Sequence, residues 1–249
     1  MAGLAASFLQ AMGFFTRLPV PATGNSELPR LNDSAIMFTF AGLAIGLVIG
    51  LAWFVAAHLL PPLPAAGVAI AAGMLLTGAL HEDGLSDTAD GLGGGHGRER
   101  ALEIMRDSRI GAYGAAALIV SIGLRWTALA EFTPLQGLFA LAAVHMTSRT
   151  AILQALAFSR YARDKGLGST VSDGVSQSTF WIAAAAAVLL SGAITGPAGW
   201  IAAAIGLFAA RIMLAWLERR LGGYTGDGLG AMEQVAEITT LLVIAGLAA

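Results

Sequence analysis

Three aspartates, Asp83, Asp87 and Asp90, follow one another closely in a stretch that otherwise holds small or apolar residues. If this stretch is a helix, each residue turns about 100° around the axis, so the three side chains share an arc of roughly 60°. Like charges at this spacing destabilise a helix unless a cation neutralises them. Mg²⁺ prefers carboxylate oxygens together with substrate phosphate. A solvated acidic helix end is the alternative, but we favour a Mg²⁺ site at these carboxylates.

A second group of charged residues lies in residues 98–109, which we predict to be helical. On such a helix Arg100, Glu103 and Asp107 share one face, and Arg106 lies beside it. Carboxylates flanked by guanidinium groups suit a metal-bound diphosphate, although a run of helix salt bridges has the same pattern. Glycines dominate residues 91–97 between the two groups, and they either let the backbone approach a phosphate closely or give flexibility. Residues 81–109 are therefore the candidate catalytic segment, with Glu103 and Asp107 as further metal ligands.

The elements that must position these residues are membrane-spanning helices. Hydrophobic residues make up 56% of the 249 residues and charged residues only 12%, whereas an ordinary globular domain is roughly 25% charged. This composition, with a net charge of −2 and no cysteine, excludes a soluble domain, a disordered chain, a nucleic-acid binder and disulfides. A spanning helix needs roughly 17–25 mostly apolar residues. Seven segments come near that length: 36–57, 63–80, 110–130, 135–158, 180–194, 198–217 and 230–249.

We therefore predict an all-α, polytopic integral membrane helix bundle of about seven transmembrane helices, forming a single domain over residues 1–249. The apolar stretch 4–15 is brief, and we expect an interfacial or re-entrant helix there. Loops 60–62, 131–134 and 195–197 contain no Lys or Arg, and every basic residue outside the spans lies on the other side. The positive-inside rule then places the N-terminus and the candidate catalytic segment in the cytoplasm and the C-terminus outside.

Charged residues inside the spans are a second set of candidates. Arg149, one turn beyond His145, is costly in a membrane unless it meets a carboxylate or a phosphate, and we favour substrate contact over structural pairing. Asp227 lies in a glycine-rich turn before the last span, and Glu237 is deep enough in that span to face the bundle interior. Arg163 has a substrate role or simply reflects the cytoplasmic charge bias. The candidate substrate-binding residues are His81, Arg100, Arg106, Arg149, Arg163, Asp227 and Glu237.

The sequence also contains motifs that resemble one known family. Residues 81–94, HEDGLSDTADGLGG, and residues 103–111, EIMRDSRIG, together resemble the cobalamin synthase family, the membrane-bound adenosylcobinamide-GDP ribazoletransferases. Weaker matches lie at 15–21, 148–149, 161–163, 166–168 and 222–231, so the resemblance covers nearly the whole chain. Two departures, no proline within 39–42 and Arg160 where proline is common, lie outside the acidic motif and concern local helix geometry.

The resemblance implies that the chain joins α-ribazole, or its 5′-phosphate, to adenosylcobinamide-GDP in a Mg²⁺-dependent reaction that expels GMP. In this hypothesis Asp83, Asp87 and Asp90 hold one or two Mg²⁺ ions, and Asp107 either completes the metal site or takes the proton of the attacking hydroxyl. Arg100 and Arg106 contact phosphate oxygens. The resemblance also implies an inner-membrane protein in contact with lipid, and a homo-oligomer remains open. The alternatives are another enzyme like the CDP-alcohol phosphotransferases, or a divalent-cation transporter.

Overall fold

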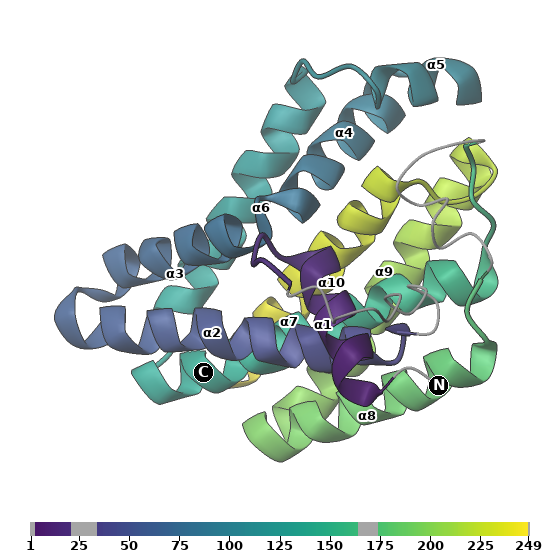
Figure 1. Cartoon of the computed structure of the whole chain (residues 1–249). Coiled ribbons are helices and arrows are strands. Elements are labelled where there is room, and N and C mark those ends of the chain that lie inside the picture. Colours follow the sequence, from purple (N-terminus) through teal and green to yellow (C-terminus); the bar gives the residue numbers. More distant parts are fainter. Residues whose placement is uncertain (1–2, 21–33, 164–173, 249) are drawn as a thin grey trace.

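A computed structural model of the chain describes residues 3–20, 34–163 and 174–248, and in these ranges it is entirely helical apart from connections. Arg30 and Lys165, which contribute to the charge bias above, and the motif at 166–168 lie outside the described residues. The helices are α1 (Leu4–Phe15), α2 (Met37–Leu59), α3 (Pro62–Thr77), α4 (Leu80–Gly94), α5 (Arg98–Ile104), α6 (Ala112–Ala130), α7 (Pro134–Phe158), α8 (Gln177–Thr195), α9 (Pro197–Leu221) and α10 (Gly226–Ala248). The all-α prediction is confirmed, and Figure 1 shows the arrangement of the bundle.

All seven predicted spans are helical, but they are not equally suited to cross a membrane. Among the described residues, five helices are long and apolar enough alone, namely α2, α6, α8, α9 and α10, and the bent pair of α3 and α4 makes a sixth. The remaining predicted span is α7, whose 25 residues begin with a Thr133–Gln136 capping box and Pro134. It is buried almost continuously from Ala140 to Leu156. By length and composition, five or six segments among the described residues qualify as membrane spans, compared with the predicted count of about seven. Helix α7 does not qualify by composition, because it carries polar side chains, which it buries inside the bundle.

The chain bends sharply between α3 and α4. The two helix axes meet at 89°, and both linking residues, Gly78 (φ 67°) and Ala79 (φ 55°), are left-handed. Glycine enters this region without steric cost, and a Cβ at position 78 would lie 2.2 Å from Nε of Arg17. The aspartates do lie on a helix, as predicted, but this helix is not a straight continuation of the second predicted span. Helix α4 instead turns away and runs beside α6 and α10 (Figure 1).

The N-terminal helix α1 is docked on the bundle. Phe15 is fully buried, and its ring meets that of Phe38 on α2 edge-on, with centroids 4.8 Å apart. The backbone N–H of Arg17 donates to the carbonyl of Leu76 on α3, at 2.8 Å. These contacts bring the end of α1 beside the start of α4, where the first family motif begins.

Candidate active site

The close crossing of α4 and α10 brings the first aspartates to the start of the last helix. A Cβ added to Gly84 would lie 2.7 Å from the carbonyl oxygen of Asp227 and 3.1 Å from Cα of Gly230. Glycine at such a crossing lets two backbones approach as no other residue does. Asp83 and Asp87 on α4 are consequently carried to the N-terminal turn of α10, where Asp227 lies.

The glycine-rich turn predicted before the last span is what places Asp227. Helix α9 ends at Leu221 and is followed by Gly222, which is left-handed with φ 76°. The chain then pairs with the segment after α7. In that pairing the N–H of Tyr224 donates to the carbonyl of Arg160 at 2.9 Å, and that of Ala162 donates to the carbonyl of Tyr224 at 2.8 Å. The hydroxyl of Thr225 accepts from the N–H of Gly228 at 2.9 Å. Helix α10 therefore starts at a fixed position beside Arg163.

These elements enclose a cavity of about 400 Å³ with charged residues in its lining. His81, Asp83, Arg163 and Asp227 line it, and Nη2 of Arg163 lies 2.8 Å from Oδ2 of Asp227. Asp87 lies within electrostatic range of Asp83, Asp227 and Arg163. Three carboxylates thus gather around one guanidinium, an excess of negative charge that suits a hard cation and a phosphate.

Asp90 has a different role from the one predicted. It is on the same helix as Asp83 and Asp87, but its side chain turns toward α6 and is buried. Its two carboxylate oxygens accept the backbone N–H groups of Gly111 at 2.7 Å and Gly114 at 2.9 Å. These N–H groups have no partner within their own helix, and a carboxylate at a helix N-terminus also meets the favourable end of the dipole. Asp90 therefore caps α6, which leaves Asp83 and Asp87 as the aspartates of this helix that stay predicted metal ligands.

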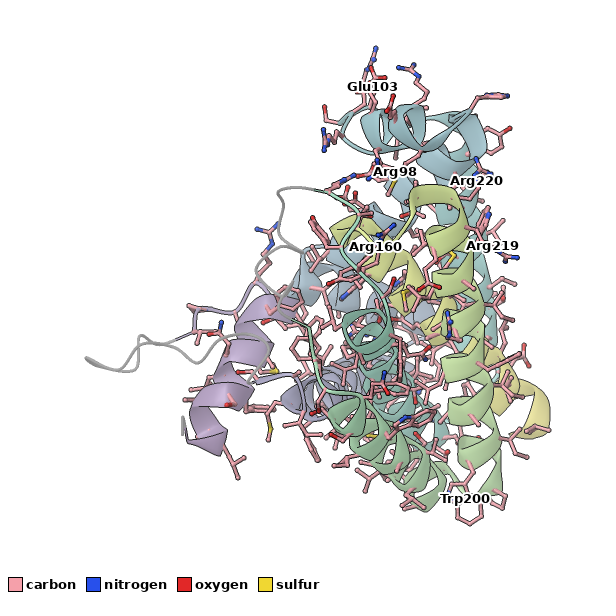
Figure 2. The ribbon with its side chains drawn as sticks, turned by 90° about the vertical axis from the view of Figure 1, so that its right-hand side faces the viewer. Arg98, Glu103, Arg160, Trp200, Arg219 and Arg220 are labelled. Carbon is pink, nitrogen blue, oxygen red and sulfur yellow. The ribbon has the colours of Figure 1, made fainter. Side chains whose placement is uncertain are left out.

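The second acidic pair lies on the surface, beyond the end of α4. Helix α5 ends at Ile104, so the prediction of a helix through residue 109 is wrong. The chain instead tightens into turns in which Asp107 accepts from the backbone N–H and guanidinium of Arg109, a local bond that competes with helix formation. These bonds lower the pKa of Asp107 to about 2. Glu103 and Arg100 form an exposed ion pair at 2.6 Å, and Arg106 is also exposed. Figure 2 shows Glu103 at the outer end of the molecule.

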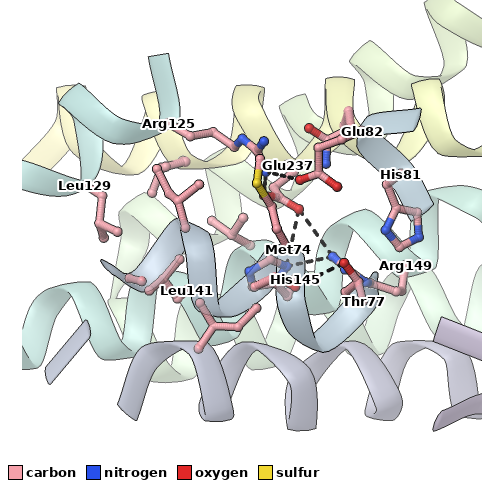
Figure 3. Close-up of a pocket in the computed structure, with 17 residues that line it drawn as sticks. Met74, Thr77, His81, Glu82, Arg125, Leu129, Leu141, His145, Arg149 and Glu237 are labelled. Carbon is pink, nitrogen blue, oxygen red and sulfur yellow. Dashed lines mark hydrogen bonds and ion pairs between the residues drawn. The ribbon is translucent and has the colours of Figure 1, made fainter. Parts of the chain in front are cut away.

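Next to the cavity, on the other side of His81, buried charged side chains join four helices. Nη1 of Arg125 on α6 lies 3.0 Å from Glu82 on α4 and 2.7 Å from Glu237 on α10. Nη1 of Arg149 on α7 contacts Glu233 and lies 3.3 Å from Glu237. Figure 3 shows the side chains converging around Glu237. We call this set the buried charge network: His81, Glu82, Arg125, His145, Arg149, Glu233 and Glu237.

Arg149 occupies the centre of this network. The ligand atoms of His145, Glu233 and Glu237 lie within 4.8 Å of one another, a spacing that could hold a metal ion. Nη1 of Arg149, however, is within hydrogen-bonding distance of all three, including 2.6 Å to Nδ1 of His145. The guanidinium therefore supplies the positive charge there. For Arg149 we favoured substrate contact, but the structure shows the alternative, structural pairing with carboxylates. Glu237 is paired in the same network.

The predicted site residues thus fall into separate groups. The cavity holds His81, Asp83, Arg163 and Asp227, with Asp87 beside it, and His81 also belongs to the buried charge network. The buried charge network holds Arg149 and Glu237, Asp90 caps α6, and the surface turn holds Arg100, Glu103, Arg106 and Asp107. Glu82 was not among the predicted site residues, and Arg125 was left open between a structural pair and a side chain that reaches the membrane surface; the structure shows the pair, as a charged residue inside an apolar segment requires. The cavity residues Phe14 and Tyr161 were not predicted either.

Comparisons with known proteins agree along nearly the whole chain. The sequence pattern described as cobalamin-5-phosphate synthase matches residues 7–245. A relative from Bradyrhizobium diazoefficiens, named adenosylcobinamide-GDP ribazoletransferase, is 44% identical over 238 residues, covering 94% of this chain and 91% of its own. Proteins of the same name from Leptothrix cholodnii and Shewanella piezotolerans are 41% and 38% identical, and each comparison covers at least 93% of both chains. No solved structure matches the chain.

Proposed function

The chain belongs to the cobalamin-5-phosphate synthase family, and we propose that it joins α-ribazole, or its 5′-phosphate, to adenosylcobinamide-GDP and releases GMP. In this reaction a hydroxyl oxygen of ribazole forms a bond to the phosphorus that carries the cobinamide, and the bond from that phosphorus to GMP breaks. The product is adenosylcobalamin or its 5′-phosphate. One observation carries the proposal: Asp83, Asp227 and Arg163, from three separate segments, line a single cavity.

We propose Mg²⁺ as the metal of this site, held by Asp83, Asp87 and Asp227. The donors fit, because all three are hard carboxylate oxygens and their combined charge exceeds that of the one guanidinium beside them. When bound, the ion would polarise the diphosphate and stabilise the departing GMP. Glu103 and Asp107 stay predictions as ligands, since both pair with arginines on the outer surface.

Arg163 is the residue that we assign to the diphosphate. Arg163 lines the cavity and forms an ion pair with Asp227, so its positive charge lies beside the proposed metal ligands. A guanidinium matches two oxygens of a phosphate at once. Held by Asp227, it would orient the phosphorus for attack, and orientation with charge neutralisation is most of what phosphoryl transfer needs.

The distribution of surface residues supports a cytoplasmic active site in the inner membrane. Arg98, Arg160, Arg219 and Arg220 lie at the end of the molecule that carries Glu103, whereas Trp200 lies at the opposite end (Figure 2). Arginines gather on the cytoplasmic side of membrane proteins, and tryptophans mark the interfaces. Large apolar side chains such as Leu75, 79% exposed, and Ile119, 73% exposed, would contact lipid.

The test is release of GMP by the purified protein in detergent, with both substrates present. We expect turnover with Mg²⁺ and none after chelation by EDTA. Asp83→Asn and Asp227→Asn should each lower kcat by about 100-fold or more, the scale of losing one electrostatic contact in a transition state. Glu99→Gln, which removes an exposed carboxylate from α5, is the matched control and should keep wild-type turnover.

Two outcomes would contradict parts of the proposal separately. Wild-type turnover in both aspartate variants would refute the assignment of the metal ligands while leaving the reaction intact. No GMP release by the wild-type protein, combined with Mg²⁺ flux in liposomes, would instead favour the transporter.

A further inference from the structure

Part of the lining of the same cavity is aromatic. Phe14, near the end of α1, and Tyr161, just after α7, both line it together with Asp83 and Asp227. They lie 147 positions apart in the sequence, so the fold, not a local motif, brings them to one space. Neither ring has a role in binding the diphosphate, and their presence beside the charged groups requires its own explanation.

Each of the two rings is supported by another aromatic ring. Phe14 stacks on Phe38 with centroids 5.7 Å apart and planes inclined by 11°. Tyr161 meets Tyr224 at 5.5 Å, edge to face, and the backbone beside it is bonded to Tyr224 in both directions. The rings are therefore held in place before any ligand arrives. A site fixed in advance loses less entropy on binding than one that must be ordered.

Aromatic platforms of this kind bind flat heterocycles by stacking. The reaction proposed above offers two such groups, the benzimidazole of α-ribazole and the guanine of adenosylcobinamide-GDP. Guanine carries several donors and acceptors on its edge, and leaving them unpaired in a buried site is costly. Apart from the charged residues, the large side chains of the lining are apolar, namely Leu80, Ile152 and Leu229. This lining suits the largely apolar benzimidazole better.

We propose that Phe14 and Tyr161 bind the benzimidazole base of α-ribazole by stacking, with its ribose directed toward Asp83 and Asp227. The inference rests on the proposed function and adds to it the residues that bind the nucleophilic substrate. It also gives α1 a role in the site, because this helix supplies one wall of the cavity.

The experiment measures steady-state kinetics of GMP release while each substrate is varied in turn. Phe14→Leu keeps an apolar side chain against Phe38 but removes the aromatic face, and Tyr161→Leu does the same on the other segment. We expect each variant to raise KM for α-ribazole by about tenfold or more, the scale of one lost base stack. KM for adenosylcobinamide-GDP and kcat at saturation should stay within about threefold of wild type.

The matched controls keep the rings. Tyr161→Phe and Phe14→Trp retain an aromatic face and should each recover most of the affinity for α-ribazole that the leucine variant at the same position loses. Calorimetric titration of α-ribazole into the wild-type protein and Phe14→Leu gives a second readout that needs no turnover, and binding should weaken by a similar factor. Elution of every variant at the wild-type volume in size-exclusion chromatography verifies that it folds.

An unchanged KM for α-ribazole in both leucine variants would overturn the inference. So would a selective rise in KM for adenosylcobinamide-GDP, because it would assign the rings to guanine or the corrin. Both results leave GMP release intact, whereas failure of the proposed function would appear as no GMP release by the wild-type protein.

Discussion

Replacing Arg149 by methionine tests whether the buried charge network holds the bundle together. Arg149 is 1% exposed and contacts two glutamates of α10. With the histidines neutral, the three glutamates contribute −3 and Arg125 and Arg149 contribute +2, a net charge of −1. Arg149→Met makes this −2 and leaves Glu233 with no cationic partner among the described residues, because His81, whose Nδ1 lies 3.7 Å away, is counted as neutral.

The expected loss of stability is large. Removing one partner of a buried ion pair costs about 3–5 kcal/mol, since the other charge stays buried and uncompensated. An exposed pair contributes only about 0–1 kcal/mol. The chain offers such a pair in Arg100 and Glu103, whose side chains are 59% and 68% exposed. Arg100→Met is therefore the matched control, with the same substitution in a solvated setting.

The assay is reversible unfolding by SDS in mixed micelles, followed by circular dichroism. We expect Arg149→Met to lower the free energy of unfolding by about 3–5 kcal/mol and Arg100→Met by less than about 1 kcal/mol. The double variant Arg149→Met/Glu233→Gln restores the net charge of −1 and should recover at least about 1 kcal/mol, as coupled neighbours do. An Arg149→Met protein as stable as Arg100→Met, or a double variant no more stable than the single one, would refute the reasoning.

Two further predictions concern the helix crossing and the outer turn. Gly84→Ala places a Cβ 2.7 Å from the carbonyl oxygen of Asp227 and should lower kcat/KM by about 10- to 100-fold, because misplacing reacting groups by 1 Å has effects of this size. Gly123→Ala on α6, where nothing lies within 4 Å, should leave activity unchanged, and equal activity of both variants would contradict the role of the crossing. Asp107, with its pKa lowered to about 2 by Arg109, stays ionised at every working pH and gains a proton only near the acid extreme. When kcat is measured against pH, its decrease toward low pH, between about pH 8 and 5, should therefore be the same in Asp107→Asn as in wild type. A different pH dependence in the variant would contradict this and support Asp107 as the general base.

Composition and spacing predicted the helices well, because the apolar segments alone determine where the chain can cross a membrane. They did not predict the bend before α4. Gly78 is one of 32 glycines, and nothing in its sequence distinguishes it from those inside helices. Ala79 adopts a positive φ that alanine rarely takes by itself, so the tertiary structure around the bend must impose it.

Helical spacing likewise predicted which side chains share a face but not what lies opposite that face. Asp83, Asp87 and Asp90 do lie on one helix, as expected. Asp90, however, meets the exposed N–H groups at the start of α6, and no count along α4 could reveal that neighbour. The glycine-rich turn at 222–231 was more informative, since its residue types predicted a turn and its acidic residue reached the cavity.

Helix α10 connects the cavity that holds Asp83 and Asp227 to the buried charge network. Asp227, Gly230, Glu233 and Glu237 follow one another at helical spacing, from the cavity through the crossing with α4 to the network. Lipid is as apolar as a leucine side chain, so apolar contacts alone do little to fix how far one helix slides along another in a membrane. Ion pairs do fix it, because a shift by one residue would leave buried charges unpaired. Glu82 on α4 and Glu237 on α10 share Arg125, so the network sets the register in which Asp83 and Asp227 reach the same cavity.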